Sequence, residues 1–292
     1  MDLVCVGDVM LDVRADAGTL ASGGDVHGRV LVQPGGTSAN AAVWAAWVGS
    51  SAAVIGAIGD DVAGDLVLAA LTERHVDTRG VGRHGDATGT MLVLHEAGER
   101  SMVADRGANA SLSPDDLPPT IGAGAVLVSG YLLLQPPTTD AALAAIARAD
   151  AELVAIETAS WPLIAAFGVD AFFDATAGAD AVLANEREAQ SLTGCEPEDA
   201  CRALGERFRL AAVKRGPHGA CLSIDGVFLS SAAPTVHEVD PTGAGDAFDG
   251  VLLAFLAQGA EPDEALRRAC QAGSRVAASL SAWPEPPSRS AG

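Results

Sequence analysis

Residues 239–256 read VDPTGAGDAFDGVLLAFL, and they carry the clearest structural signal in the chain. Asp240 ends a segment of β type, Gly243 and Gly245 permit a tight turn, and the apolar pattern after Asp246 predicts a helix. Backbone N–H groups at the start of such a helix point into solvent and bind anions. We therefore expect a phosphate or phosphoryl group to lie against this turn.

Asp246 is the residue that does not fit a simple anion-binding turn. A carboxylate repels a bound anion, unless it is there to accept a proton from a nucleophile. One interpretation is therefore a general base for a hydroxyl group that attacks a phosphoryl group. The other is structural, because acidic residues in the first turn of a helix interact favourably with the helix dipole.

Along the rest of the chain, short apolar runs alternate with longer amphipathic ones. The runs are polar on neither side, which is typical of strands that are covered on both faces. Such an alternation predicts an α/β fold of three layers: a doubly wound, mostly parallel sheet with helices on both faces and ligands at the carboxyl ends of its strands. The expected strands are residues 3–7, 52–59, 125–130, 153–157, 181–185 and 210–216, and the expected helices are residues 139–148, 186–192, 197–207 and 263–280.

Two insertions interrupt the alternation, at about residues 13–35 and 88–109. The first is rich in glycine and contains the strand-like GRVLVQ. The second contains MLVLH, the turn EAGE and RSMVAD, which together form a hairpin pattern. Both insertions would leave the sheet at its strand ends, so they predict a small β lid over the site. An open hairpin leaves backbone groups unpaired, which suggests a homodimer through the lid.

Composition narrows the classes of partner. The 292 residues include 38 acidic and 18 basic ones, for a formal net charge of −20. Such a surface repels phosphate backbones and anionic lipids, so neither nucleic acid nor a membrane is an expected partner. With 49% hydrophobic and 19% charged residues, the chain has enough apolar side chains for a continuous core, and we expect a single domain over residues 1–292.

The remaining reactive and aromatic residues predict little chemistry. The five cysteines are scattered, with no C-x-x-C pair, and indicate reduced thiols in a cytoplasmic protein. The six histidines lack metal-ligand spacing. Trp44 and Trp47 lie at helical spacing and are expected in the core. The tail from Trp283 onward contains three prolines and is expected to be frayed.

Two motifs carry a family resemblance. The segment DPTGAGDAFDG, residues 240–250, resembles the C-terminal signature of the ribokinase-like (PfkB) carbohydrate kinases, with Pro241 as a departure from the usual D-T-T-G-A-G-D. PGGTSANAAVWAAWVG at 34–49, followed by IGAIGDDVAGD at 55–65, is similar to the family's N-terminal pattern. The motifs lie in the family's order, about 200 residues apart, and the resemblance spans about residues 4–280. It implies the ribokinase-like fold and an ATP-dependent kinase.

The resemblance assigns one set of residues to the phosphates and their metal ion. The turn Gly243–Ala244–Gly245 would hold the charge on the transferred phosphoryl oxygens. The segment ANERE resembles the family's N-x-x-E motif, which implies that Asn185 and Glu188 organise Mg²⁺ through its waters. The same two residues also fit a helix N-cap with a capping box, so a structural role stays open.

A second set would contact the nucleotide and a monovalent cation. VKRGPHGA resembles the family's nucleotide-binding turn, which includes Gly216 and Gly219. Lys214 is the only lysine in the chain, and it is either a phosphate contact or an ordinary surface charge. A monovalent cation such as K⁺ near Asp240 and Thr242 is a family trait that the resemblance carries over.

A third set would bind the phosphoryl acceptor. The segment VGDVMLD ends on Asp12, which matches a family residue that accepts hydrogen bonds from substrate hydroxyls. One carboxylate can accept from two hydroxyls, which suits a vicinal diol. Gly35, Gly36 and Asn40 match the family's substrate-binding turn. Arg106 follows the lid hairpin and is either a contact for a substrate carboxylate or phosphate, or a solvated hairpin residue.

Two departures from the ribokinase pattern bear on the substrate. Met10 stands where ribokinases carry Asn, and Thr37 and Ser38 replace their Lys-Gly, so ribose is not the expected acceptor. The resemblance implies that the γ-phosphoryl group of ATP is transferred to a primary hydroxyl of a sugar or sugar-like molecule. Asp246 would be the general base, and Mg²⁺ would be a cofactor.

Three other functions are alternatives to this prediction. A nucleoside kinase would keep the fold and change only the acceptor. A non-catalytic regulator that binds nucleotide or sugar would gain nothing from Asp246 beside the anion site. A dinucleotide-dependent oxidoreductase is excluded, because the glycine after Gly243 and Gly245 is Gly250, which comes too late for the G-x-G-x-x-G motif.

Overall fold

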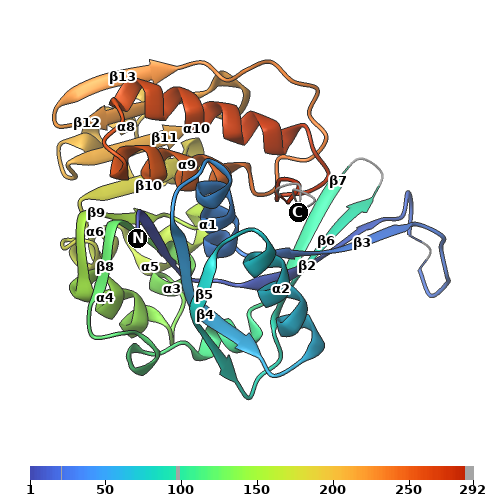
Figure 1. Cartoon of the computed structure of the whole chain (residues 1–292). Coiled ribbons are helices and arrows are strands. Elements are labelled where there is room, and N and C mark those ends of the chain that lie inside the picture. The colour runs from blue at the N-terminus through green and yellow to red at the C-terminus, as the bar shows by residue number, and fades with distance from the viewer. Residues whose placement is uncertain (21, 97–98, 287–292) are drawn as a thin grey trace, which may run out of the picture.

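A nine-stranded sheet forms the centre of the computed structural model, which describes residues 1–20, 22–96 and 99–286 (Figure 1). The strand order is β13-β12-β11-β10-β9-β8-β1-β4-β5, and all pairs are parallel except the two that involve β12. The strands are β1 (Leu3–Val6), β4 (Ala52–Gly59), β5 (Asp77–His84), β8 (Ile121–Ser129), β9 (Ala149–Glu157), β10 (Ala181–Asn185), β11 (Leu210–Lys214), β12 (Ala220–Ile224) and β13 (Val227–Ser231).

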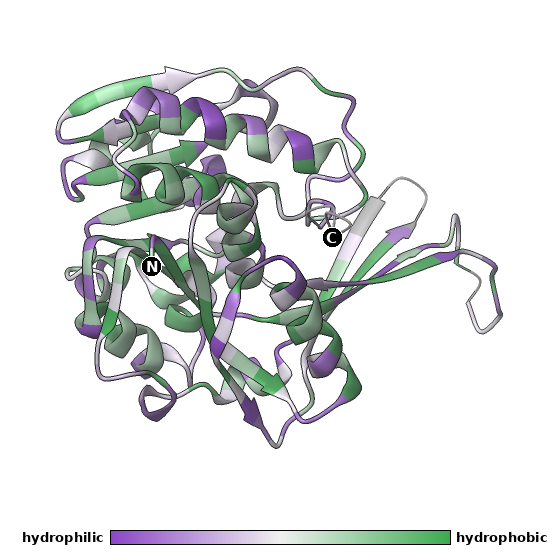
Figure 2. Ribbon diagram, in the orientation of Figure 1, coloured by the Kyte–Doolittle hydropathy of each residue, from purple (hydrophilic) through white to green (hydrophobic). Residues whose placement is uncertain are grey.

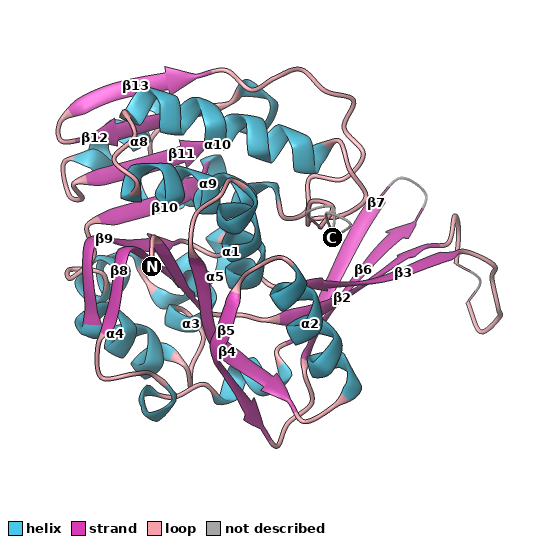
Figure 3. Ribbon diagram, viewed as in Figure 1, coloured by secondary structure: helices cyan, strands magenta, loops and turns pink. Residues whose placement is uncertain are grey.

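Helices cover both faces of this sheet (Figure 3). Side chains alternate along each strand, so Leu3 and Cys5 of β1 join one hydrophobic cluster and Val4 and Val6 join the other. The first cluster includes residues of α1 (Thr37–Trp47), α2 (Val62–Glu73), α9 (Ala244–Ala257) and α10 (Pro262–Ala277). The second includes residues of α3 (Gly130–Leu133), α4 (Thr139–Arg148), α5 (Trp161–Phe167), α6 (Val169–Ala175), α7 (Glu186–Thr193) and α8 (Pro197–Gly205). The predicted three-layer α/β fold is confirmed.

The predicted strands and helices agree closely with the structure, with one exception near the site. All six apolar runs form strands, and the four amphipathic stretches form α4, α7, α8 and α10. The expected β-type segment before Asp240 is absent, because residues 232–241 contain no helix or strand. Val236 and Val239 are β-branched, which favours extended backbone, but the segment pairs with neither sheet in the described chain.

A second, four-stranded sheet extends away from the main body, at the right of Figure 1, in the order β3-β2-β6-β7. Its strands are β2 (Met10–Asp16), β3 (Arg29–Gly35), β6 (Gly89–Glu96) and β7 (Glu99–Asp105). The two strands of the predicted hairpin are confirmed as the antiparallel pair β6 and β7, while Ala97 and Gly98 of its expected turn lie outside the described residues. The first insertion starts earlier than residue 13, since β2 already pairs with β3 and β6 at Met10. Asp12 therefore belongs to the small sheet and not to the end of β1.

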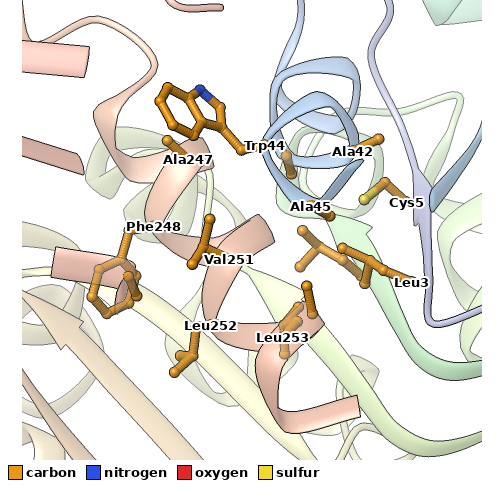
Figure 4. Packing of buried hydrophobic residues seen from close by; sticks show 14 of the residues in the cluster. Leu3, Cys5, Ala42, Trp44, Ala45, Ala247, Phe248, Val251, Leu252 and Leu253 are labelled. Atoms are coloured by element: carbon orange, nitrogen blue, oxygen red, sulfur yellow. The ribbon is translucent and has the colours of Figure 1, made fainter. Parts of the chain in front are cut away.

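Helices α1 and α9 pack together over β1 in the first hydrophobic cluster (Figure 4). Trp44 from α1 and Val251 from α9 are buried there, beside Cys5 of the strand. Gly250 lies at the closest approach of the helices, where a Cβ atom would overlap the carbonyl oxygen of Ala41. The contact therefore needs a residue without a side chain at position 250.

The C-terminal tail corrects the expectation of a frayed end. Ala282 and Trp283 are buried. The indole N–H of Trp44 donates to the carbonyl oxygen of Ala282 at 2.8 Å, and the side chain of Trp283 packs beside Arg74, whose guanidinium carbon lies 5.1 Å from the ring centroid. Residues 287–292 lie outside the described part of the chain. Trp44 is in the core as expected, but Trp47 is 43% exposed.

Hydrophobic residues concentrate inside the main body. Figure 2 shows apolar residues along the central strands, while α10 alternates hydrophilic and hydrophobic positions. All five cysteines are free thiols, and four of them are buried. Within the described ranges, no helix has the length and the apolar character needed to cross a membrane.

Gly250→Ala tests the contact between α1 and α9. Helix propensity alone would raise the free energy of unfolding by about 1 kcal/mol. The overlap with Ala41 is expected to outweigh this gain, so that the free energy of unfolding falls by about 1–3 kcal/mol in total. Urea unfolding followed by circular dichroism measures the change. Gly122→Ala is the control, because nothing lies within 4 Å of the new Cβ there. A more stable Gly250→Ala variant would contradict the analysis.

Candidate active site

Two cavities meet at the start of α9, near the carboxyl ends of the parallel strands. The carboxylate cavity measures about 360 Å³ and is named for Asp8, Asp12, Glu157 and Asp246, which line it. The loop cavity measures about 250 Å³ and is bounded by the loops at residues 216–219 and 233–241 together with α9 and α10. Of the predicted site residues, Asp12, Gly36, Asn40, Arg106, Thr242, Gly243 and Asp246 line the first, and Lys214, Gly216, Gly219, Ala244 and Gly245 line the second.

Asp246 lies in the first turn of α9 and is held by a short hydrogen-bond relay. The Nδ2 of Asn40 donates to its Oδ2 at 2.7 Å, and the indole N–H of Trp283 donates to the Oδ1 of Asn40 at 2.6 Å. Because Trp283 occupies the amide oxygen, the NH₂ group of Asn40 must face Asp246. Burial raises the pKa of Asp246 to about 6, although the Asn40 hydrogen bond favours the ionised form.

Asp12 approaches the same cavity from the small sheet. Its side chain is buried against Gly35, where a Cβ atom would overlap the carboxylate, so the glycine makes room for it. Burial, together with the charges of Asp246 and Asp240, raises the pKa of Asp12 to about 7. Gly36 precedes α1 with φ 97°, a backbone conformation that favours glycine.

Arg106 lines the cavity with its charge already paired. Its guanidinium donates to Asp8 Oδ1 at 3.2 Å and to Thr138 Oγ1 at 3.2 Å. Burial raises the pKa of Asp8, while Arg106 acts in the opposite direction. Among the described residues that line the cavity, Arg106 is the only basic one, and it faces four carboxyl groups.

The turn that leads into α9 is braced by Asp240. Gly243 has φ 83°, in the left-handed region. Asp240 Oδ1 accepts hydrogen bonds from Thr242 N at 3.0 Å and from Thr242 Oγ1 at 2.7 Å, and its Oδ2 forms an ion pair with Arg14 of β2. The turn therefore has a fixed shape before any ligand binds.

Lys214 is not an ordinary surface charge. It ends β11, and its Nζ donates to Asp249 Oδ2 at 2.6 Å, one helical turn after Asp246. Desolvation disfavours the charged amine, but the carboxylates of Asp249, Glu157 and Glu188 outweigh it and raise the pKa of Lys214. Nζ also lies 3.5 Å from the position that a Cβ on Gly245 would take, so the cation lies beside the turn at the start of α9.

Asn185 and Glu188 form the capping box at the start of α7. Asn185 Oδ1 accepts from the N–H groups of Arg187 and Glu188, both at 3.0 Å, and Glu188 Oε2 accepts from Asn185 N at 2.8 Å and from Thr158 Oγ1 at 2.6 Å. Neither residue lines either cavity. Their structural interpretation therefore holds, and the capping box does not test a role toward a metal ion.

Several site residues were not identified from the sequence. Glu157 ends β9, and its buried Oε2 has no partner in the described chain. Burial and the nearby Glu188 raise its pKa strongly. An acidic residue at the carboxyl end of a buried strand was the available signal for this position. Asp8, Asp249, Arg14 and Trp283 act through partners far away in the sequence, for which the sequence contained no signal.

The comparisons with known proteins agree with one another. The model of the pfkB family carbohydrate kinases matches residues 1–287. The chain is 32% identical to a fructokinase from Klebsiella pneumoniae over 271 residues, which cover 88% of this chain and 85% of that protein.

Two solved structures are similar in fold. The adenosine kinase from Sinorhizobium meliloti has a TM-score of 0.86 at 22% identity and covers 97% of this chain and 96% of its own. A putative ribokinase II from E. coli, in complex with ATP and Mg²⁺, has a TM-score of 0.85 at 23% identity and covers 95% and 93%. With a family model that spans nearly all of its residues, the chain belongs to the pfkB family of carbohydrate kinases, as its two motifs indicated.

Proposed function

We propose that this kinase transfers the γ-phosphoryl group of ATP to a primary hydroxyl of a sugar or sugar-like small molecule. The observation that carries the proposal is the meeting of two cavities at one helix start: Asp246 faces the carboxylate cavity, and Ala244 and Gly245 face the loop cavity. ATP would occupy the loop cavity and the acceptor the carboxylate cavity. The family membership and the ATP complex of the E. coli neighbour support this arrangement.

Asp246 would accept the proton of the attacking hydroxyl. A pKa of about 6 keeps most of this carboxylate ionised at neutral pH, and it makes Asp246 a stronger base than an exposed aspartate. Asn40 holds the carboxylate in place from α1. The proton moves to an Asp246 oxygen as the hydroxyl oxygen attacks the γ-phosphorus.

Groups beside the loop cavity would stabilise the negative charge that develops on the transferred phosphoryl oxygens. The N–H groups of Gly243 and Gly245 lie at the start of α9, where the helix dipole also favours an anion, whereas the N–H of Ala244 donates to the carbonyl oxygen of Pro241 at 3.1 Å. Lys214 lies beside the same turn and would contact the phosphates of ATP. Gly216 and Gly219 line the loop cavity that would hold the nucleotide.

A magnesium ion would be held mainly by the nucleotide phosphates and by water, because the described residues contain no group of three or more Asp, Glu, His or Cys side chains that could hold a metal ion. Glu157 Oε2 is buried and has no protein partner within the described residues, so it remains available to such a bound group. Mg²⁺ prefers oxygen ligands and is commonly held through waters and nucleotide phosphates. Glu188 would hold it through water, with Asn185 beside it. When bound, the ion neutralises phosphate charge and makes ADP a better leaving group.

The acceptor would be oriented by hydroxyl contacts. Asp12 can accept two hydrogen bonds from neighbouring hydroxyls, with Gly35 making room for its carboxylate and Gly36 lining the cavity beside it. Arg106 would add a donor at the rim, although its charge is matched by Asp8. The carboxylate cavity is lined by four carboxyl groups and one arginine, whose charge is already paired. This balance disfavours an anionic acceptor, so we propose a neutral one.

A nucleoside is the second candidate acceptor, and the walls of the cavity favour it. Met10, Met91 and Met102 of the small sheet, together with Tyr131, add apolar surface to the carboxylate cavity. Such a surface suits a nucleobase, while Asp12 would bind the ribose diol. A pure regulator without turnover is an outcome of the experiment below.

The small sheet would act as a lid and as a dimer interface within one domain. Its inward face presents Asp12 and Met91 to the cavity. Its outward face carries Val30, Val32 and Val103, each more than half exposed. A closed lid would exclude water, which otherwise competes as acceptor. A second copy of the chain would cover the exposed valines, in the cytoplasmic location expected from the cysteines.

The first test is ADP release from MgATP across neutral sugars, sugar acids, sugar phosphates and nucleosides. One neutral acceptor is expected to give turnover, and Asp246→Asn is expected to lower kcat by about 10²–10⁴-fold with its melting temperature retained. Asp263→Asn is the matched control, because Asp263 is also in the first turn of a helix but is exposed on α10.

Two outcomes would contradict this proposal. Equal small effects of both substitutions would favour the helix-dipole interpretation of Asp246. Binding of MgATP without turnover for any acceptor would favour the regulator.

The acid limb of the pH–rate profile tests the relay to Asp246. Native kcat/KM is expected to fall as the pH drops through about 7 to 6, where Asp12 and Asp246 become protonated. Trp283→Phe frees the Asn40 amide to turn its oxygen toward Asp246, which raises the Asp246 pKa and moves the limb to higher pH. Trp44→Phe also loses a buried N–H bond to the tail, and it should lower the melting temperature without moving the limb. Equal shifts in both variants would contradict the relay.

Sedimentation velocity tests the proposed dimer. The native protein is expected to sediment with twice the mass of one chain, and Val32→Glu is expected to sediment as a monomer, because a charge would replace an apolar contact. Val227→Glu is the control, since Val227 is similarly exposed but lies on β13 at the far edge of the main sheet. A native protein that sediments as a monomer at micromolar concentration would overturn the proposal.

A further inference from the structure

Arg14 brings a positive charge from the small sheet into the turn before α9. It lies on β2, and its side chain is only 10% exposed. Its NH1 forms an ion pair with Asp240 Oδ2 and donates to the carbonyl oxygen of Leu280 at 3.4 Å. Gln33 Nε2 donates to the same carbonyl at 3.5 Å. The guanidinium therefore contacts both the turn and the C-terminal tail.

Asp240 needs such a partner. Its Oδ1 is used by Thr242, which fixes the turn, and the carboxylate is buried. An uncompensated negative charge at this place would weaken the positive potential at the start of α9, where the transferred phosphoryl group would lie. Neutralisation of Asp240 is therefore a requirement for the anion site as well as for the stability of the turn.

The family resemblance implies a monovalent cation such as K⁺, which would meet this requirement. A cation at Asp240 and Thr242 would draw on the same oxygens that Arg14 already uses, the Asp240 carboxylate and the Leu280 carbonyl. The space left beside the guanidinium is a cavity of about 10 Å³, which has room for about one water molecule at most. A cation there would also face a fixed positive charge. The residues present therefore do not fit a monovalent cation.

We propose that Arg14 takes the place of a monovalent cation, so that turnover of this kinase does not depend on K⁺. Arg14 is a positioning residue, because it acts on the reaction through Asp240 and the turn. It lies two residues after Asp12 and on the same inward face of β2, so the closing lid delivers the acceptor contact and the compensating charge together. The inference rests on the proposed function.

The test compares salts at one ionic strength: chlorides of K⁺, Na⁺, NH₄⁺ and tetramethylammonium. The rate of ADP release by the native protein, measured with the acceptor identified in the test above, is expected to agree within twofold among the four salts. Arg14→Ala is expected to lose at least tenfold in kcat in tetramethylammonium chloride, and to regain activity with K⁺ or with millimolar guanidinium. Arg29→Ala, at an exposed arginine of the same small sheet, should behave as the native protein.

Thermal melting in the same salts gives a readout that is independent of activity. The melting temperature of the native protein should not respond to K⁺ over Na⁺, whereas that of Arg14→Ala should rise with K⁺ or millimolar guanidinium. Arg14→Lys keeps the positive charge and replaces the alanine variant in the experiment if that variant does not fold. The melting temperature of Arg14→Lys should not respond to K⁺.

A native protein that is activated severalfold or selectively stabilised by K⁺ would overturn the inference. A folded Arg14→Ala with full activity in every salt would overturn it too. Absence of turnover in all salts would instead overturn the proposed function, while the melting temperatures still decide the role of Arg14.

Discussion

The close approach of α1 and α9 is the contact on which the rest of the site depends. Gly250 lets the two helix backbones meet, and one turn earlier the same geometry brings Asn40 within 2.7 Å of Asp246. The start of α9 is thereby fixed against β1 and against the tail that carries Trp283. A site for phosphoryl transfer works by positioning and electrostatics, so a rigid helix start is the feature it needs most.

The main sheet could be predicted because its strands are covered on both faces. Their apolar runs have no polar side, and this pattern can be recognised in each strand's own sequence without knowing which strands lie beside it. Residues 232–241 were predicted wrongly, because β-branched residues such as Val236 and Val239 favour extended backbone but do not reveal whether a partner strand is present. The tail was also misjudged, because proline content says nothing about Trp283, whose burial depends on α1 and α2.

Residues of the candidate site could be predicted only where they lie in a recognisable sequence motif. Asp246, Asn40, Asp12 and Lys214 stand in recognisable segments, and the structure brings all four to the two cavities. The ion pairs and relays that set their charge states could not be foreseen. Arg14 and Asp240, for example, are 226 positions apart, and their contact exists only because the small sheet folds onto the turn. The sequence likewise could not show whether Lys214 is buried, because its ion pair with Asp249 forms only in the folded chain.

The two cavities share no lining residue. All but three residues of the carboxylate cavity come from the first 159 positions, and every residue of the loop cavity comes from position 214 onward. Substitutions that reshape one cavity therefore leave the other intact, with only the turn before α9 between them. With ATP in the loop cavity, as proposed, such a division would let evolution exchange the acceptor while the donor is retained. It fits a family whose relatives are named for substrates as different as fructose and adenosine.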